Sequence, residues 1–205
     1  MSGAAARPRA AGGAPGAALI DIVAALGLAG VMMAVAVPAL SAVVPETEAR
    51  LAARYLAARF QHARLEALKR NANVGVVFAP PGDPFGFVLA VDANGNGVRR
   101  REVDDGGDPV IQPRDRLADH WPRVAVAVRA ALPGIDGGAA VQPAPDGVRF
   151  GASRMVVFSP LGGATSGTLY LTSSAGGAYA VRVTGTTGRV RAWRLDAVAR
   201  QWHPL

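Results

Sequence analysis

The residues best suited to bind a ligand are arginines near the carboxyl end of the chain. Segment 180–205 holds a single acid, Asp196, and five arginines: Arg182, Arg189, Arg191, Arg194 and Arg200. The pattern GRVRAWRL at 188–195 is typical of a half-exposed strand, in which Arg189, Arg191 and Trp193 share one face. Guanidinium groups bind phosphates, and an indole ring stacks on a base or on an arginine. Arg189, Arg191 and Arg194 are therefore candidates for contacts with DNA. The alternative is a polar strand face whose arginines pair with acids of the sheet or of a neighbouring subunit.

A second motif, DANGNG at 92–97, places Asp92, Asn94 and Asn96 at alternate positions. A calcium-binding loop begins in this way, but it needs a bidentate glutamate at its twelfth position, which here is Val103. Asn-Gly pairs also form tight turns between strands. The motif favours a hairpin turn, and a calcium site at Asp92, Asn94 and Asn96 is the alternative. The nearby acids are expected to lie in a solvated loop: Asp104, Asp105 and Asp108.

Other signatures of catalysis are missing from the sequence. The three histidines, His62, His120 and His203, lie far apart and show no metal-ligand spacing. There is no cysteine, and no G-x-S-x-G, P-loop or H-E-x-x-H motif occurs. The sequence therefore predicts neither an enzyme nor a cofactor. The net charge of +7 is compatible with an anionic partner but identifies none.

The longest apolar stretch of the chain, residues 17–44, carries one charge, Asp21, and is interrupted by Pro38. It exceeds the roughly 20 residues that cross a bilayer, and the two arginines before it favour a cytoplasmic amino terminus. Three interpretations fit: a permanent anchor, a signal peptide cut after Ser41, and a short leader cut after Gly16 that leaves the apolar helix on the protein. Placing an acid within a membrane helix costs free energy, so Asp21 favours an interpretation in which the acid has a function.

Gly16, Leu19, Ile20, the acid at Asp21 and Pro38 together resemble the amino-terminal segment of type IV pilins and pseudopilins. The family usually has phenylalanine where this chain has Ala17 and glutamate where it has Asp21. The resemblance implies cleavage between Gly16 and Ala17 by a prepilin peptidase and methylation of Ala17. It also implies that Asp21 pairs with the amino terminus of a neighbouring subunit during assembly.

A second helical segment follows the apolar run. Residues 46–71 are rich in alanine, leucine, arginine and glutamate and contain neither glycine nor proline. One stripe at helical spacing holds Leu51, Tyr55, Ala58 and Leu65, whereas Leu56 and Phe60 fall elsewhere, so two contact faces are expected. Pro38 should kink or locally melt the combined helix, and Pro45 is a second candidate break.

From residue 72 onward the sequence pattern is typical of short strands bounded by glycine, proline and asparagine. The predicted strands are 74–78, 85–91, 124–128, 155–158, 167–172, 178–183 and 188–195, and segment 131–147 is expected to be a loop. Strands that follow one long helix predict an α+β fold, in which a pilin-type helix with a transmembrane first half packs on a head of antiparallel sheet. The expected parts are a leader at 1–16, a transmembrane or filament-core helix at 17–44, the second half of the stem helix at 45–71 and a β-rich head at 72–205.

The segments ARLEALKRN, FVLAVDANGNG, VVFSPLGGATSGTLYL and VRVTGTTGRVRAWR, in this order, are similar to the GspH/FimT group of minor pilins and pseudopilins. The resemblance implies a structural subunit of the type II secretion pseudopilus, anchored once in the bacterial inner membrane with its head in the periplasm. A DNA-binding minor pilin is the alternative, because the group's DNA-binding members carry a similar G-R-x-R element. The implied partners are other pilins or pseudopilins, the prepilin peptidase, inner-membrane lipid, and secreted cargo or DNA.

Overall fold

The computed structural model describes residues 15–205, apart from the side chains of 15–18, 35–42 and 136. Most of the expected leader at 1–16 therefore lies outside the described residues. Helix α1 spans Pro15–Arg70, and the chain divides between Ala42 and Val43 into two compact units. Among the described residues, no helix meets the length and hydropathy that a membrane crossing requires.

The first unit contains the amino-terminal part of α1. Its large apolar side chains are 57–69% exposed, from Leu19 at one end to Met33 at the other. The helix continues through Pro38 and Pro45, so the predicted melting at these prolines is not found. A proline removes one amide donor from a helix, and here the helical turns on either side of each proline are retained.

The second unit contains two antiparallel sheets, which we name A and B. Sheet A has the strand order β3-β2-β1-β6 and consists of β1 (Val74–Phe78), β2 (Gly86–Val91), β3 (Val110–Arg116) and β6 (Met155–Phe158). Sheet B has the order β10-β9-β8-β7-β4, with β5 also paired to β7. Its strands are β4 (Val124–Ala125), β5 (Val148–Arg149), β7 (Gly167–Ser173), β8 (Ala178–Thr184), β9 (Arg189–Asp196) and β10 (Gln201–Pro204). Three short helices connect them: α2 (Arg100–Asp105), α3 (Leu117–His120) and η1 (Ile135–Gly137).

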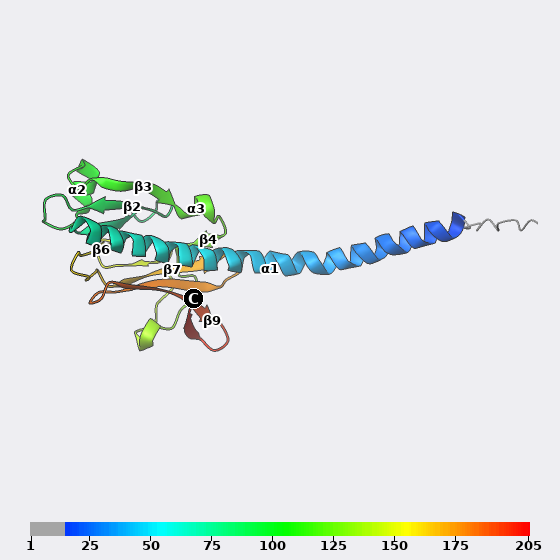
Figure 1. Ribbon diagram of the computed structural model, residues 1–205. Helices are drawn as coiled ribbons and strands as arrows, with labels where there is room; N and C mark the ends of the chain where they lie inside the picture. Colours follow the sequence, from blue (N-terminus) through cyan, green and yellow to red (C-terminus); the bar gives the residue numbers. More distant parts are fainter. Residues whose placement is uncertain (1–14) are drawn as a thin grey trace, which may run out of the picture. The chain divides into compact units, whose positions relative to one another are not determined.

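Both sheets pack against the second half of α1, which runs between the green strands of sheet A and the orange strands of sheet B (Figure 1). The fully buried face of this helix is mostly alanine, because small side chains allow a helix and a sheet to approach closely: Ala49, Ala52, Ala53, Leu56, Phe60, Ala63 and Ala67. The ring of Phe60 packs against Phe78 and Phe150, with centroid distances of 6.0 and 6.1 Å. These contacts join the helix to both sheets in one core, and the predicted α+β class is confirmed.

The stripe predicted from the sequence is not the side of α1 that packs on the sheets. Leu51 and Leu65 are 48% and 53% exposed, whereas Leu56 and Phe60, placed outside the stripe, are fully buried. Of the two contact faces expected from the sequence, the one that holds Leu56 and Phe60 packs on the sheets, and alanines fill most of it. The outward leucines form a separate surface.

Candidate functional site

The strands of sheet B separate an inner face, turned toward α1, from an outer face. On β9, Val190 belongs to the core shared with α1, so its neighbours Arg189 and Arg191 lie on the outer face together with Trp193. The same alternation on β8 places Val181 and Val183 inside and Arg182 outside. The prediction that Arg189, Arg191 and Trp193 share a face is confirmed.

Strand register extends this basic surface across the sheet. Arg149 on β5 lies opposite Thr168 on β7, Thr168 lies opposite Arg182 on β8, and Arg182 lies opposite Arg191 on β9. We call Arg149, Arg182 and Arg191 the arginine row. Arg189 lies one step along β9, opposite Thr184. The row therefore joins residues of three strands, β5, β8 and β9, on one face.

The members of the row are held by different contacts. Arg149 donates from Nη1 to the carbonyl oxygens of Asp146 and Val148, at 2.9 and 3.1 Å. Arg182 donates to the carbonyl oxygen of Ile135 at 3.5 Å. The guanidinium of Arg191 lies 5.9 Å from the ring centroid of Trp193. Such a contact preorganises a cation while leaving its hydrogen-bond donors available.

Two hollows adjoin the row. One, of about 430 Å³, lies between segment 140–144 and a floor that includes Arg149, Thr168 and Tyr170. The other, of about 90 Å³, is lined by Arg182, Thr184, Arg189, Arg191 and Trp193. Within the part of the chain that the structure describes, neither Arg189 nor Arg191 forms an ion pair. The outer face thus presents cationic donors beside concave surface, an arrangement suited to a polyanion.

The structure places one of the three predicted arginines on the other face of the sheet and brings two further arginines beside the remaining pair. Arg194 lies opposite Tyr179 and His203, on the inner side of the strand, and not with Arg189 and Arg191. Sequence reasoning had not selected Arg149 or Arg182. The β8–β9 hairpin brings Arg182 beside Arg191, and the pairing of β5 with β7 brings Arg149 to the same row; this second pairing joins strands that are not consecutive and leaves no local signal in the sequence.

In the turn at residues 92–97, which we call the Asp92 turn, side chains accept hydrogen bonds from the backbone of the turn itself. The carboxylate of Asp92 accepts the amides of Gly95 and Gly97 at 2.7 and 2.8 Å, and Nδ2 of Asn73 at 2.9 Å. Burial alone would raise the pKa of Asp92, but the hydrogen bonds from Asn73, Gly97 and Gly95 hold that pKa below its ordinary value. The turn leads into α2 and not directly into a paired strand.

The remaining polar groups near this turn are also engaged. Asn94 and Asn96 both donate to Glu102, at 2.8 and 3.0 Å. Asp108 is fully buried and accepts the amide of Arg99 at 3.0 Å, so the prediction that it lies in a solvated loop was wrong. No group of three or more His, Asp or Glu residues that could hold a metal ion occurs in residues 15–205 as described.

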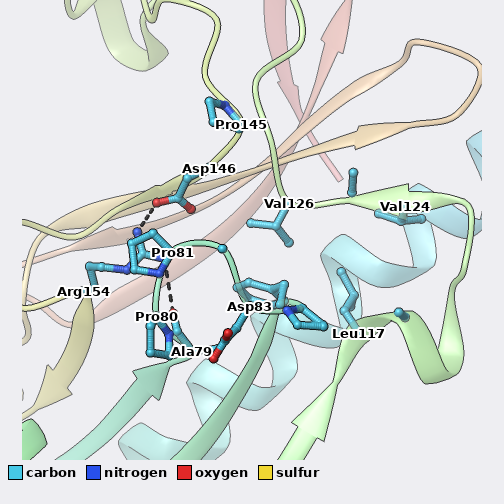
Figure 2. A pocket seen from close by; sticks show the side chains of 15 residues that line it. Ala79, Pro80, Pro81, Asp83, Leu117, Val124, Val126, Pro145, Asp146 and Arg154 are labelled. Carbon is cyan, nitrogen blue, oxygen red and sulfur yellow. Dashed lines mark hydrogen bonds and ion pairs between the residues drawn. The ribbon is translucent and has the colours of Figure 1, made fainter.

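A cleft of about 260 Å³ lies between the β1–β2 turn, α3 and segment 124–126. Figure 2 shows Asp146 and Arg154 facing each other at this cleft, where they form an ion pair. Burial would raise the pKa of Asp146, but Arg154 and the Val148 amide lower it overall. Arg154 also donates to the Ala79 carbonyl at 3.3 Å. Because Asp146 precedes β5 and its carbonyl receives Arg149, this ion pair helps to position one end of the arginine row.

The residues predicted to act in processing and assembly lie in α1. Gly16 and Ala17 fall in its first turn, and Asp21 is an exposed position on the same helix. The side chain of Pro38 lies outside the described residues. The roles of these four residues stay predictions.

Comparison with known proteins identifies the group to which the chain is related. Residues 52–188, about two thirds of the chain, match the family model described as type II transport protein GspH. The chain is also similar to the pilin-like protein PilA1 of Thermus thermophilus, with 42% identity over 92 residues. That match covers 44% of this chain and 54% of the relative, so the chain spans about half the length of that protein. No solved structure matches. Because the GspH model covers both sheets up to the start of β9, the chain belongs to the type II transport protein GspH family.

Proposed function

We propose that this protein is a minor pseudopilin of a type II secretion system, acting in protein secretion by assembly and not by catalysis. The observation that carries the proposal is the GspH match over 52–188, which covers a β-rich head built on the carboxyl half of one long helix. The similarity to a pilin-like protein supports the same structural role. In this role the chain assembles with other pilins or pseudopilins.

The amino-terminal segment supplies the second part of the proposal. A prepilin peptidase cleaves after Gly16, and Ala17 becomes the methylated amino terminus. Residues 17–44 then anchor the subunit in the lipid of the inner membrane and pack in the filament core, with the head in the periplasm. Support comes from the apolar composition of this segment, whose one charge is Asp21. Asp21 sets the registry between neighbours by pairing with an amino-terminal ammonium group.

The mature protein isolated from its own host is expected to begin at Ala17, with or without one methyl group. Intact mass measurement and amino-terminal sequencing give the answer directly. Gly16→Val should leave the leader attached, because a branched side chain replaces the smallest residue at the cut, whereas Gly12→Val should be processed normally. A chain that begins at Ala42, or that keeps Met1 or Ser2, would contradict the proposal.

A second function, binding of DNA by a minor type IV pilin, is favoured by the arginine row. The row and Arg189 supply four guanidinium groups on one sheet face, and Trp193 lies beside them. Phosphate contacts by such groups release counterions, so this binding would weaken steeply as salt rises. In a secretion pseudopilus the same face would meet secreted cargo.

Replacing both Arg189 and Arg191 with alanine should weaken duplex DNA binding and reduce the slope of log affinity against log salt by about 2, because two phosphate contacts are lost. The measurement is a fluorescence anisotropy titration at several salt concentrations. Arg194→Ala is the matched control: it removes the same charge from the same strand, but from the inner side. An unchanged affinity in the double variant, or an equal loss in the control, would exclude this function for the row.

A further inference from the structure

The outward side of α1 in the second unit carries a short, regular apolar ridge. Leu51, Ala58 and Leu65 are spaced seven residues apart, and all three are exposed. Leu68, three residues beyond Leu65, is 48% exposed and extends the ridge by one turn. We call these four residues the seam. Seven-residue spacing keeps side chains in line along one narrow strip of a helix, which is the pattern by which one helix packs against another.

Cations flank this seam. With Leu51, Ala58 and Leu65 at the first heptad position, Arg54 occupies the fourth position, and Arg50 and Arg64 occupy one flank. The opposite flank holds Tyr55, His62 and Lys69. Among the described residues, Arg50, Arg54 and Arg64 take part in no ion pair.

The glutamates of this half of the helix are engaged elsewhere. Glu46 accepts hydrogen bonds from Tyr179 and the Gly177 amide, and Glu48 forms an ion pair with Arg123. Glu66 forms ion pairs with Lys69 and Arg70 at 3.0 Å each. The charge left to face a partner along the seam is therefore positive.

We propose that the seam binds an amphipathic helix of a different subunit, with apolar residues along its stripe and acidic residues on both flanks. Charges beside a helix–helix seam decide which partner is accepted. A second copy of this chain would bring the same three arginines, Arg50, Arg54 and Arg64, to the seam, so the pattern disfavours self-pairing. An anionic membrane surface is a poorer fit, because a helix that lies on lipid presents a broad apolar face, and this one is a single ridge. The proposal deepens the assembly role proposed above.

The test uses the full chain in detergent and two synthetic three-heptad peptides. Both peptides have leucine at the first and fourth heptad positions; one has glutamate and the other lysine on the flanks. The chain should bind the glutamate peptide at least about tenfold more tightly than the lysine peptide. Leu51→Ser combined with Leu65→Ser should remove that binding. Arg50→Glu combined with Arg54→Glu should invert the preference, while tryptophan fluorescence shows that the head remains folded.

A thiol experiment reports on self-pairing. The chain has no cysteine, so Ala58→Cys introduces a unique thiol in the middle of the seam. Under mild oxidation, a mixed disulfide with a glutamate peptide that carries cysteine at a first heptad position is expected. A homodimer would overturn the proposal, as would equal affinity for the two peptides or a preference that charge reversal leaves unchanged. These measurements need neither processing nor a filament, so their failure would be separate from a failure of the cleavage experiment.

Discussion

Replacing Phe60 with alanine should lower the free energy of unfolding of the head by about 3–5 kcal/mol. Phe60 is fully buried, and its ring packs against Phe78 of sheet A and against Phe150, which lies next to β5 of sheet B. Most of the neighbouring positions on the buried helix face are alanines, which cannot extend into the space. The cost should therefore combine lost burial with a persistent cavity.

Urea unfolding of the full chain, followed by tryptophan fluorescence, measures this change. All three tryptophans lie in the second unit, at Trp121, Trp193 and Trp202, so the signal reports on the head. Leu65→Ala is the matched control, because Leu65 lies on the outward side of the same helix. It should change the free energy by about 0.5 kcal/mol or less. Equal losses in the two variants would mean that the helix is packed the other way round.

Gly177→Ala should destabilise the head by about 2–4 kcal/mol through displacement of a neighbouring carboxylate. A β-carbon at position 177 would lie 2.1 Å from Oε2 of Glu46, closer than any non-bonded contact permits. Glu46 accepts hydrogen bonds from the hydroxyl groups of Ser173 and Tyr179 and from the Gly177 amide. Burial, together with Glu46, raises the pKa of Tyr179 to about 12, so this hydroxyl keeps its proton and its role as a donor. Moving Glu46 would leave buried donors unpaired.

A double-mutant cycle tests this cause. Once Glu46→Ala has removed the carboxylate, the additional cost of Gly177→Ala should fall below about 1 kcal/mol, because the clash no longer exists. Unfolding midpoints of the four proteins in urea give the coupling. Additive losses would show that the alanine at 177 acts through the backbone of the turn and not through Glu46.

The strands were largely predictable because each is a short apolar run with clear boundaries. β1 and β6 coincide with their predicted ranges, β7 and β8 are one residue longer than predicted, and β9 is shifted by one residue at both ends. Strand β3 was missed because its sequence, VIQPRDR, contains a proline and three charges. It is an edge strand of sheet A, where one side has no partner and proline is tolerated. The predicted strand at 124–128 shortens to Val124–Ala125, and Val128 pairs instead with Ala144 of the following loop.

The candidate site was predictable only within single segments. Alternation along one strand correctly grouped Arg189 with Arg191, because the period of a strand is local. The same alternation places Arg194, an even-numbered position like Val190, on the inner side, whereas Arg149 and Arg182 join the row through register. Two glutamates of α1 show the same limit, because both have an arginine four residues later: Glu66 pairs with Arg70, but Glu46 binds the β7–β8 turn and forms no ion pair with Arg50 in the described residues. For Glu46, partners brought by tertiary folding replaced the local one.

The arginine row also has a consequence for timing in the cell. Arg182 and Arg191 come from consecutive strands, but Arg149 comes from β5, more than thirty residues earlier, so the three guanidinium groups are adjacent only after sheet B has formed. In a newly made chain that has not folded, the arginines are dispersed, and no ordered surface for an anionic ligand exists. If the head crosses the inner membrane before it folds, the abundant nucleic acid of the cytoplasm never meets the completed row. Folding of sheet B would then create the affinity of this face for anions only after the crossing.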